Sequence, residues 1–524
     1  MIDTKLLRQK ILDLAIRGKL VPQNPNDEPA SVLLQKIREE KAALVKAGKI
    51  KKDKHESIIF RGEDKRYYEK IDGKTTDITE QIPFEIPNGW EWCRLRELGI
   101  FSGGKTPSMN NPNFWNGDVL WVTSKDMKCK YINDTGLKVS DVGADELELL
   151  PIDTLLMVTR SGILRHTFPI AICERPCTIN QDLKSLSLYL PPTAEYVFNV
   201  LKASEGRILS NYKKTGTTVE SIMWDQFVDI MIPISPLAEQ TRLVVQIDSL
   251  LADVDKIDAD SVIFEDFLSL SKQKVLDLAI RGKLVPQDPS DEPASELLKK
   301  IKDEKEALIK AGKIKRDKRE SFVFRGDDNR YYEDDGKNKI DVTTLLPFEI
   351  PKSWVWCRFN AIGELNPRNK ADDNTLSSFV AMAHLFGGYG SAFETTTKVW
   401  KEIKQGFTHF AENDVVFAKI TPCFQNRKSA IMKNLKNGIG AGTTELHVMR
   451  CNSSLINLKY VLFFVKTQKF INDGLSTTLG VVGQQRIDST FVGNYFFPLP
   501  PRTEQKRIVS QIELVFAQLE TMRE

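Results

Sequence analysis

The sequence predicts an α/β (α+β) protein in which two mixed α/β domains are joined by long helices. These helices are expected to form an antiparallel coiled-coil spacer, and the whole chain to follow a pseudo-two-fold internal repeat. Three observations predict this architecture. An apolar seam with a 3.5-residue period runs through the middle of the chain, a long stretch of sequence occurs twice, and short apolar runs bounded by turn residues fill the remainder.

The central seam has members spaced alternately by four and three residues. They are Leu243, Ile247, Leu250, Val254, Ile257, Ser261, Phe264, Leu268, Ser271, Val275 and Leu278, so only two serines interrupt it. This period is typical of a helix that packs along a partner helix. Pro236 favours a helix start, and Gly282 with Pro286 favours its end. We therefore expect one helix from about 236 to 282 within a spacer segment 236–286.

The partner of this helix is expected to come from the two ends of the chain. Residues 501–508 repeat 236–243 at an offset of 265, and residues 7–14 repeat 271–278 at an offset of 264. Segments 501–524 and 1–22 together reproduce most of the seam. We predict that a helix from about Glu504 and a helix ending near Arg17 abut, forming a split copy of the central helix that packs antiparallel to it.

The internal repeat defines the two domains. LDLAIRGKLVPQ occurs letter for letter at 12–23 and 276–287, and the match continues to Trp90 and Trp92, which correspond to Trp354 and Trp356. Beyond these tryptophans, the two halves share little sequence but have nearly equal lengths, which is typical of one fold carrying two different surfaces. The tryptophans could stack nucleic-acid bases, but because they belong to the repeat we interpret them as packing. The expected domains are 23–235 (framework 23–95, variable part 96–235) and 287–500 (framework 287–358, variable part 359–500).

Each framework is expected to contain a helix, at 31–47 and 295–311, with Ser31 as a cap and Gly48 as a stop. The helix ends are basic: residues 36–54 carry eight Lys/Arg against three acids, and residues 299–319 carry ten against four. Such a run is usually a solvated face, but its repetition leaves contact with phosphates or an acidic partner open. In the variable parts we expect strands near 119–123, 155–159, 230–234, 414–418 and 495–499, and helices near 196–209 and 459–472.

Composition sets the class of protein. The chain has 524 residues, of which 28% are charged and 41% hydrophobic, so we expect a soluble globular protein of several domains. It has no apolar run long enough for a membrane span and no secretion signal, so we expect it in the cytoplasm without membrane contact. Its seven cysteines form no paired zinc motif, so we expect free thiols, no metal site and no cofactor. With a net charge of +3, any nucleic-acid binding must come from local patches.

Three motifs resemble catalytic sites, and the surrounding residues argue against each. Residues 99–106 have phosphate-loop spacing, but Pro107 prevents the helix that such a loop needs. Asn111-Pro-Asn-Phe resembles a loop of amino-methyltransferases, yet no glycine-rich cofactor loop accompanies it. Asp27 with residues 39–41 imitates a nuclease cluster but lies on a solvated helix. We therefore expect no catalytic residues.

Loops rich in hydroxyl, amide and basic side chains join the elements of both variable parts, and such side chains contact phosphates and base edges of DNA. The DNA-binding candidates in the first variable part are Lys105, Thr106, Lys125, Arg160, Arg165, Lys213, Lys214, Thr217 and Thr218. Those in the second are Arg368, Lys370, Lys419, Arg427, Lys428, Gln484, Gln485 and Arg486. We expect the loop 213–218 to face DNA, with Arg160 and Arg165 nearby.

The two LDLAIRGKLVPQ frameworks, with helix starts PLAEQ at 236–240 and PRTEQ at 501–505, resemble the specificity subunit of type I restriction-modification enzymes. The wording of the repeat is most similar to the branch called type IB. The resemblance implies a non-catalytic subunit whose two target-recognition domains read a bipartite DNA target. It also implies partners: double-stranded DNA, two modification (methyltransferase) subunits that carry S-adenosylmethionine, and restriction subunits that hydrolyse ATP with Mg²⁺.

Two other classes of function remain as alternatives. A nuclease or methyltransferase acting on DNA by itself would need a set of carboxylates or a cofactor pocket. A structural coiled-coil adaptor would read no DNA. Binding to pools of random duplexes separates these hypotheses.

Overall fold

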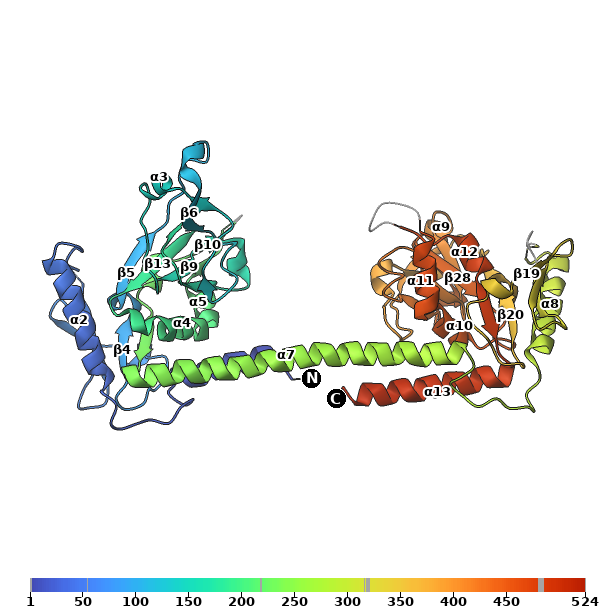
Figure 1. Ribbon diagram of the computed structural model, residues 1–524, viewed down its shortest axis with the longest axis horizontal. Coiled ribbons are helices and arrows are strands. Elements are labelled where there is room, and N and C mark those ends of the chain that lie inside the picture. Colours follow the sequence, from blue (N-terminus) through green and yellow to red (C-terminus); the bar gives the residue numbers. More distant parts are fainter. Residues whose placement is uncertain are drawn as a thin grey trace. The chain divides into compact units, whose positions relative to one another are not determined.

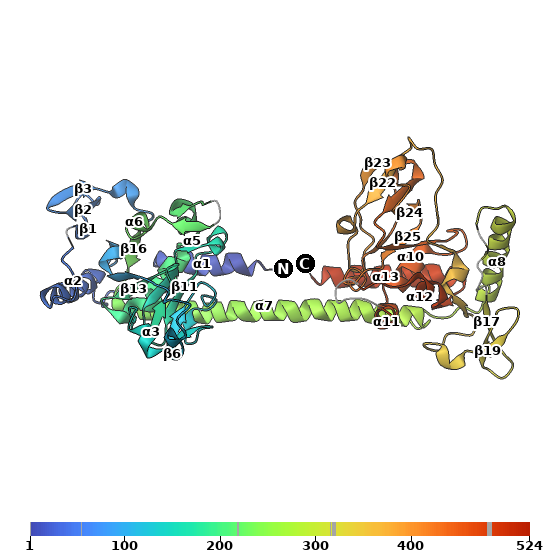
Figure 2. The same ribbon diagram turned by 90° about the horizontal axis from the view of Figure 1, so that it is seen from above.

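A computed structural model describes residues 2–53, 55–216, 219–314, 316, 321–478 and 485–523 (Figures 1 and 2). The chain divides into two compact units, Ile2–Ser261 (the first unit) and Val262–Glu524 (the second unit). Helix α7 (Leu237–Ile280) begins in the first unit and ends in the second. Both units mix helices with small sheets, so the predicted α/β class is confirmed.

The first unit has a five-stranded sheet in the order β5-β13-β9-β11-β7, accompanied by smaller sheets β12-β6-β8, β10-β15-β14, β1-β2-β3 and β16-β4. Its strands are β1 (Ser57–Arg61), β2 (Tyr67–Ile71), β3 (Lys74–Asp77), β4 (Glu91–Arg94), β5 (Gly99–Gly103), β6 (Trp115–Val122), β7 (Tyr131–Ile132), β8 (Lys138–Val139), β9 (Leu155–Val158), β10 (Arg160–Ser161), β11 (Ile170–Cys173), β12 (Cys177–Ile179), β13 (Leu183–Leu188), β14 (Lys213–Lys214), β15 (Glu220–Ile222) and β16 (Met231–Ile234). Its helices are α1 (Thr4–Ile16), α2 (Ala30–Lys46), α3 (Asp141–Ala144), α4 (Ala194–Ala203), α5 (Glu205–Asn211) and α6 (Trp224–Phe227).

The second unit has two four-stranded sheets, β21-β28-β25-β26 and β23-β22-β27-β24, and the smaller sheets β17-β18-β19 and β20-β29. Its strands are β17 (Phe322–Arg325), β18 (Tyr331–Asp334), β19 (Lys339–Asp341), β20 (Val355–Arg358), β21 (Glu364–Leu365), β22 (Leu376–Val380), β23 (Thr396–Val399), β24 (Thr408–Ala411), β25 (Val415–Ala418), β26 (Ser429–Ile431), β27 (Ile439–Gly442), β28 (Leu446–Arg450) and β29 (Phe496–Leu499). Its helices are α8 (Ala294–Lys310), α9 (Trp400–Ile403), α10 (Leu458–Val465), α11 (Gln468–Ser476), α12 (Ser489–Asn494) and α13 (Arg502–Thr521).

In the first unit, α1 packs antiparallel on the first half of α7. Leu243, Ile247 and Val254 are at most 2% exposed and share one apolar core with α1, as the seam predicts. Arg8, early in α1, forms an ion pair with Asp255 at 2.6 Å, while the chain that follows α1 returns to the beginning of α7.

In the second unit, α13 packs in the same way on the second half of α7. Leu276 shares the core with Ile508 and Ile512, and Arg523, two residues after α13, forms an ion pair with Glu265 at 2.8 Å. The two antiparallel helix pairs therefore repeat each other. The N-terminal helix belongs to the first unit and the C-terminal helix to the second, so the prediction that the two chain ends abut stays a prediction.

In each unit, a buried polar contact joins the repeated framework to the beginning of a long helix, α7 in the first unit and α13 in the second. Glu239, at the beginning of α7, accepts hydrogen bonds from Trp90 Nε1 at 2.9 Å and from Gln23 Nε2 at 2.7 Å. Burial raises the pKa of this carboxyl group. Trp90 and Trp92 are 4% and 1% exposed, so the interpretation of these tryptophans as packing is confirmed for this unit. The second unit repeats both bonds with Glu504, Trp354 and Gln287, at 2.8 and 2.6 Å.

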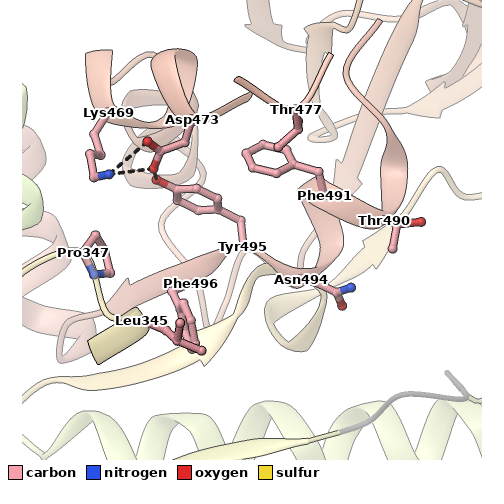
Figure 3. Close-up of a pocket in the computed structure, with 10 residues that line it drawn as sticks. All are labelled: Leu345, Pro347, Lys469, Asp473, Thr477, Thr490, Phe491, Asn494, Tyr495 and Phe496. Atoms are coloured by element: carbon pink, nitrogen blue, oxygen red, sulfur yellow. Dashed lines mark hydrogen bonds and ion pairs between the residues drawn. The ribbon is translucent and has the colours of Figure 1, made fainter. Parts of the chain in front are cut away.

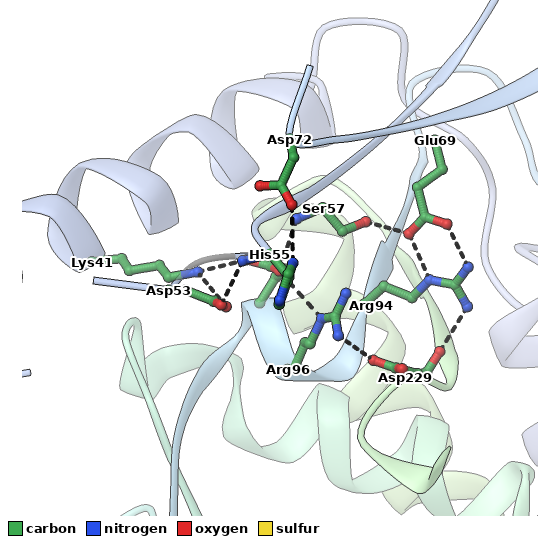
Figure 4. A network of polar contacts seen from close by, with 10 residues as sticks. Lys41, Asp53, His55, Ser57, Glu69, Asp72, Arg94, Arg96 and Asp229 are labelled. Carbon is green, nitrogen blue, oxygen red and sulfur yellow. Dashed lines mark hydrogen bonds and ion pairs between the residues drawn. The ribbon is translucent and has the colours of Figure 1, made fainter. Parts of the chain in front are cut away.

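A second polar network joins the framework sheet to the variable part (Figure 4). Arg94 donates to both carboxylate oxygens of Glu69, at 2.9 and 2.7 Å, and Ser57 donates to the same carboxylate. Burial alone would raise the pKa of Glu69, but these hydrogen bonds outweigh it and lower the pKa. Lys41 on α2 forms a buried ion pair with Glu97 at 2.8 Å. This pair fixes α2 to the segment that leads into β5.

The structure corrects three local predictions. Helix α2 begins at Ala30, so Ser31 is not its cap; the Ala30 N–H instead donates to the Gly89 carbonyl at 2.8 Å, which replaces a side-chain cap. The helix predicted at 196–209 is divided into α4 and α5, and the helix predicted at 459–472 into α10 and α11. In the second case, Thr467 is extended and caps the new helix through the N–H of Phe470. The five predicted strands correspond to β6, β9, β16, β25 and β29.

Candidate nucleic-acid interface

The small sheet β10-β15-β14 gathers candidates from distant parts of the first variable segment. Ser221 in the central strand pairs with Arg160 on one side and Lys214 on the other. Directly paired residues project from the same face of a sheet, so both cations lie on one face beside Ser221. Both side chains are exposed, and neither forms an ion pair with a described residue. This row is therefore suited to contact with an anion.

The opposite face of the same sheet holds Lys213 and Arg165. Lys213 pairs with the buried Ile222 and is half-buried. The Nε of Arg165 lies 2.7 Å from Glu220 Oε1, and this hydrogen bond lowers the pKa of Glu220. Arg160 thus lies in the same small sheet as Lys213 and Lys214, and Arg165 lies beside it, bound to Glu220. That the loop 213–218 faces DNA stays a prediction.

Lys105, Thr106 and Lys125 lie in turns at other edges of the first unit. The backbone N–H of Lys105 donates to Ile179 at 3.0 Å, which fixes the turn, while its exposed ammonium lies 3.9 Å from Glu146. Thr106 is half-buried and Lys125 is exposed. Because residues 99–103 form strand β5 and a turn follows, this segment is not the strand–loop–helix unit of a phosphate loop.

In the second unit, Arg368 and Lys419 line one hollow of about 290 Å³. Arg368 donates to the Phe407 carbonyl at 3.1 Å. Burial and the charge of Arg368 lower the pKa of His409, which also lines the hollow. Lys370 is exposed on the same loop as Arg368. The hollow therefore presents two cations beside a neutral imidazole.

Arg427 and Lys428 have internal contacts, which differs from the sequence prediction. The Arg427 guanidinium lies 4.9 Å from the ring centre of Tyr389, and its Nε donates to the Lys466 carbonyl at 3.0 Å. Lys428 Nζ donates to the Met382 carbonyl at 2.8 Å. Both cations stabilise the turn between β25 and β26, so packing explains them without DNA.

Lys466 beneath this turn leads to a pH prediction. Its side chain is fully buried, and Nζ donates to the carbonyls of Gly388, Arg427 and Ser429 at 2.8, 3.0 and 3.3 Å. Burial, with a contribution from Arg427, lowers its pKa to about 7. Above pH 7 this lysine releases its proton in the folded protein but keeps it in the unfolded chain. The free energy of unfolding therefore rises with pH until the pH reaches the ordinary pKa of lysine, near 10.

Between pH 7 and 9, we expect the free energy of unfolding of the wild type to rise by about 1 kcal/mol per pH unit relative to that of Lys466→Met. Urea denaturation at pH 7, 8 and 9 measures it. A difference that does not change with pH would mean that Lys466 stays charged in the folded protein.

Gln485 and Arg486 of the second unit lie beside Ile420 and Thr421. Arg486 forms a bridge with Ile420, as Ser221 pairs with β10, and its guanidinium binds Glu445 at 2.8 Å. Gln485 Oε1 accepts a hydrogen bond from Thr478 at 3.0 Å. Arg486 is therefore already bound by a carboxylate of its own unit, as Arg165 is in the first unit. Thr217, Thr218 and Gln484 lie outside the described residues.

Sequence reasoning missed two carboxylates that hold these cations. Glu220 is 55 positions from Arg165, and Glu445 is 41 positions from Arg486. No local pattern links such distant residues, since the strands that bring them together are identified only by the fold.

A separate hollow of about 430 Å³ lies between α11, α12 and the beginning of β29 (Figure 3). Lys469 donates to both oxygens of Asp473, at 2.9 and 2.8 Å, and the Tyr495 hydroxyl donates to Asp473 at 2.6 Å. Phe491 and Phe496 complete the wall. Since Lys469 and Asp473 bind each other, the hollow presents an aromatic rather than a cationic lining.

Within the described ranges, no three His, Cys, Asp or Glu side chains are placed so as to hold a metal ion. The cysteines are free, although Cys173 and Cys177 Sγ lie 2.9 Å apart. No helix in the described part of the chain is both long and apolar enough to cross a membrane.

The first unit contains a segment that is similar to known proteins. Residues 87–259 match the family described as "Type I restriction modification DNA specificity domain". The specificity subunits of the type I restriction enzymes EcoEI and EcoAI, both from Escherichia coli, are each 44% identical to this chain over 239 residues. That alignment covers 45% of this chain and 37% and 38% of the two relatives, so the chain spans well under half of their length. A crystal structure of the HsdS subunit from Thermoanaerobacter tengcongensis is 15% identical with a TM-score of 0.44, covering 84% of this chain and 93% of the other.

Proposed function

Because residues 87–259 make this chain a relative of the specificity subunits of type I restriction enzymes, we propose that it is the DNA-reading subunit of such a complex. It binds a bipartite duplex target, one half through each variable part, and directs methylation or cleavage by its partners. One observation carries the proposal: the matched segment contains the β10-β15-β14 sheet, whose outer face presents Arg160 and Lys214. An exposed row of cations is what contact with a phosphate backbone requires.

The partners follow from the same proposal. Two modification subunits supply S-adenosylmethionine chemistry, and restriction subunits supply ATP hydrolysis with Mg²⁺, so this chain needs no catalytic residue of its own. The repeated α1–α7 and α13–α7 helix pairs support two equivalent docking positions for the modification subunits. We place the complex in the cytoplasm, where its DNA substrate is.

The test is a selection from random duplexes with the chain bound to its modification subunits. We expect one enriched target with two defined parts separated by an undefined spacer. The chain alone, incubated with duplex and Mg²⁺ or with S-adenosylmethionine, should neither cut nor methylate it; either reaction would favour the self-acting nuclease or methyltransferase. Absence of any DNA binding would favour the structural adaptor.

The two variable parts are expected to act as independent modules. Replacing 96–235 with the corresponding segment of a relative should change one half of the selected target and leave the other half unchanged, because the framework contacts of Glu239 and Glu504 stay intact. The same selection measures this. Loss of both halves in a protein that remains folded would show that the modules depend on each other.

A further inference from the structure

The ends of α2 and α8 carry the same exposed residues in both units. Lys46-Ala47-Gly48-Lys49 recurs as Lys310-Ala311-Gly312-Lys313, and all eight residues are exposed. The variable parts of the same two units have diverged almost completely. A surface that touches a different sequence in each unit has to differ, whereas a surface that touches the same chemistry in both can stay identical. These helix ends, called here the lysine tips, are therefore suited to an invariant chemical group.

Three other lysines of the same helices have carboxylate partners, whereas the tip lysines have none among the described residues. Lys36 lies 2.7 Å from Glu28 and Lys300 lies 2.7 Å from Glu292. Lys41 is paired in the interior. In contrast, the tip lysines form no ion pair with any described residue (Lys46, Lys49, Lys310 and Lys313). Their charges are therefore available to an external anion.

The helix that carries the first tip, α2, is packed along one face. Leu33, Leu34 and Ile37 bury one face of α2, and the Lys41–Glu97 pair fixes it to the variable part. Helix α2 ends at Lys46, and two residues later Gly48 has a φ of +70° and nothing within 4 Å of an added Cβ, so the tip is open to solvent. A fixed helix end loses less conformational freedom on binding than a flexible tail.

The amino-acid composition of the lysine tips indicates whether their partner is DNA or a protein surface. Protein interfaces need an apolar core with aromatic or large aliphatic side chains. Among the described residues of 30–53 and 294–314, no large hydrophobic side chain is exposed. Phosphate groups, by contrast, need only positive charge and are the same in every DNA sequence.

We propose that the two lysine tips bind the sugar–phosphate backbone of DNA independently of its sequence. This proposal rests on the proposed function, since it assigns the tips a part in holding the same duplex. In this proposal the variable parts select the target sequence. The lysine tips of the framework add a second contact with DNA, which contributes salt-sensitive affinity for any duplex.

The test compares full-length variants in binding to a random-sequence duplex over a range of salt concentrations. Lys46→Ala with Lys49→Ala, and Lys310→Ala with Lys313→Ala, should each flatten the log–log salt dependence by about two, because each phosphate contact contributes roughly 0.9. The selected target and the random duplex should lose affinity by the same factor. The arginine versions of these variants should retain the wild-type slope.

The matched control is Lys36→Ala with Lys300→Ala, which removes two charges from the same helices at positions already paired with glutamates. It should leave the slope unchanged. If wild type binds duplex but the tip variants keep its slope, the tips do not touch DNA and the proposal is overturned. If that unchanged slope accompanies weaker assembly with the partner subunits, the tips bind an acidic protein face instead. If wild type binds no duplex at all, the proposed function itself fails.

Discussion

Replacing Gly18 with alanine is expected to destabilise the first unit by about 2–5 kcal/mol. Gly18 follows α1 with φ at +63°, a conformation that costs an L-residue roughly 1–2 kcal/mol. An added Cβ would also lie 2.3 Å from Cγ of Pro87 and 3.2 Å from Trp90, so the framework proline must move. This close approach explains why the glycine, the proline and the tryptophan all belong to the repeat.

The chain contains a matched control for this prediction. Gly48 has φ at +70° but nothing within 4 Å of an added Cβ, so Gly48→Ala should carry only the conformational part, about 1–2 kcal/mol. Urea denaturation followed by tryptophan fluorescence measures both variants. Equal losses would mean that the contact with Pro87 contributes nothing.

The second large effect is expected from Arg160→Ala combined with Lys214→Ala. These cations flank Ser221 on one face of the β10-β15-β14 sheet, so removing both should eliminate about two phosphate contacts. The log–log salt dependence should flatten by about two, and affinity at 0.1 M salt should fall roughly 10–100-fold. Salt-dependent binding to the selected duplex measures both quantities.

Lys202→Ala provides the control for that variant. It removes a lysine of the same variable part whose ammonium already lies 2.8 Å from Glu205, so its salt dependence should match the wild type. An unchanged slope in the double variant, with a normal fold, would show that this face of the sheet points away from the duplex.

The framework could be predicted from the sequence because its signals are periodic or repeated. The 3.5-residue period of α7 predicted that Leu243, Ile247 and Val254 are buried. The internal repeat predicted that the two units pack their helices in the same way. The division of 196–209 into α4 and α5 could not be predicted, since its apolar pattern continues through Ser204.

The candidate site was predictable in part. Arg160, Arg165, Lys213 and Lys214 could be named as candidates from their chemistry, but only the fold brings them to one small sheet. The internal contacts of Arg427 could not be predicted, because Tyr389 and Lys466 come from elements that only the fold brings beneath the turn. A basic residue in a loop looks the same in a sequence whether it faces solvent or a carbonyl.

The division of α7 between the units has a consequence for synthesis on the ribosome. The first unit is one continuous stretch of chain, so all its partners have been made once the first half of α7 emerges. Leu276, on the second half of α7, packs against Ile508 and Ile512, which are synthesised only near the end of the chain. At about 5–20 residues per second, the intervening chain of about 230 residues takes roughly 10–50 s to appear. During that interval an apolar helix face is uncovered, and a nascent-chain chaperone would find its binding site there.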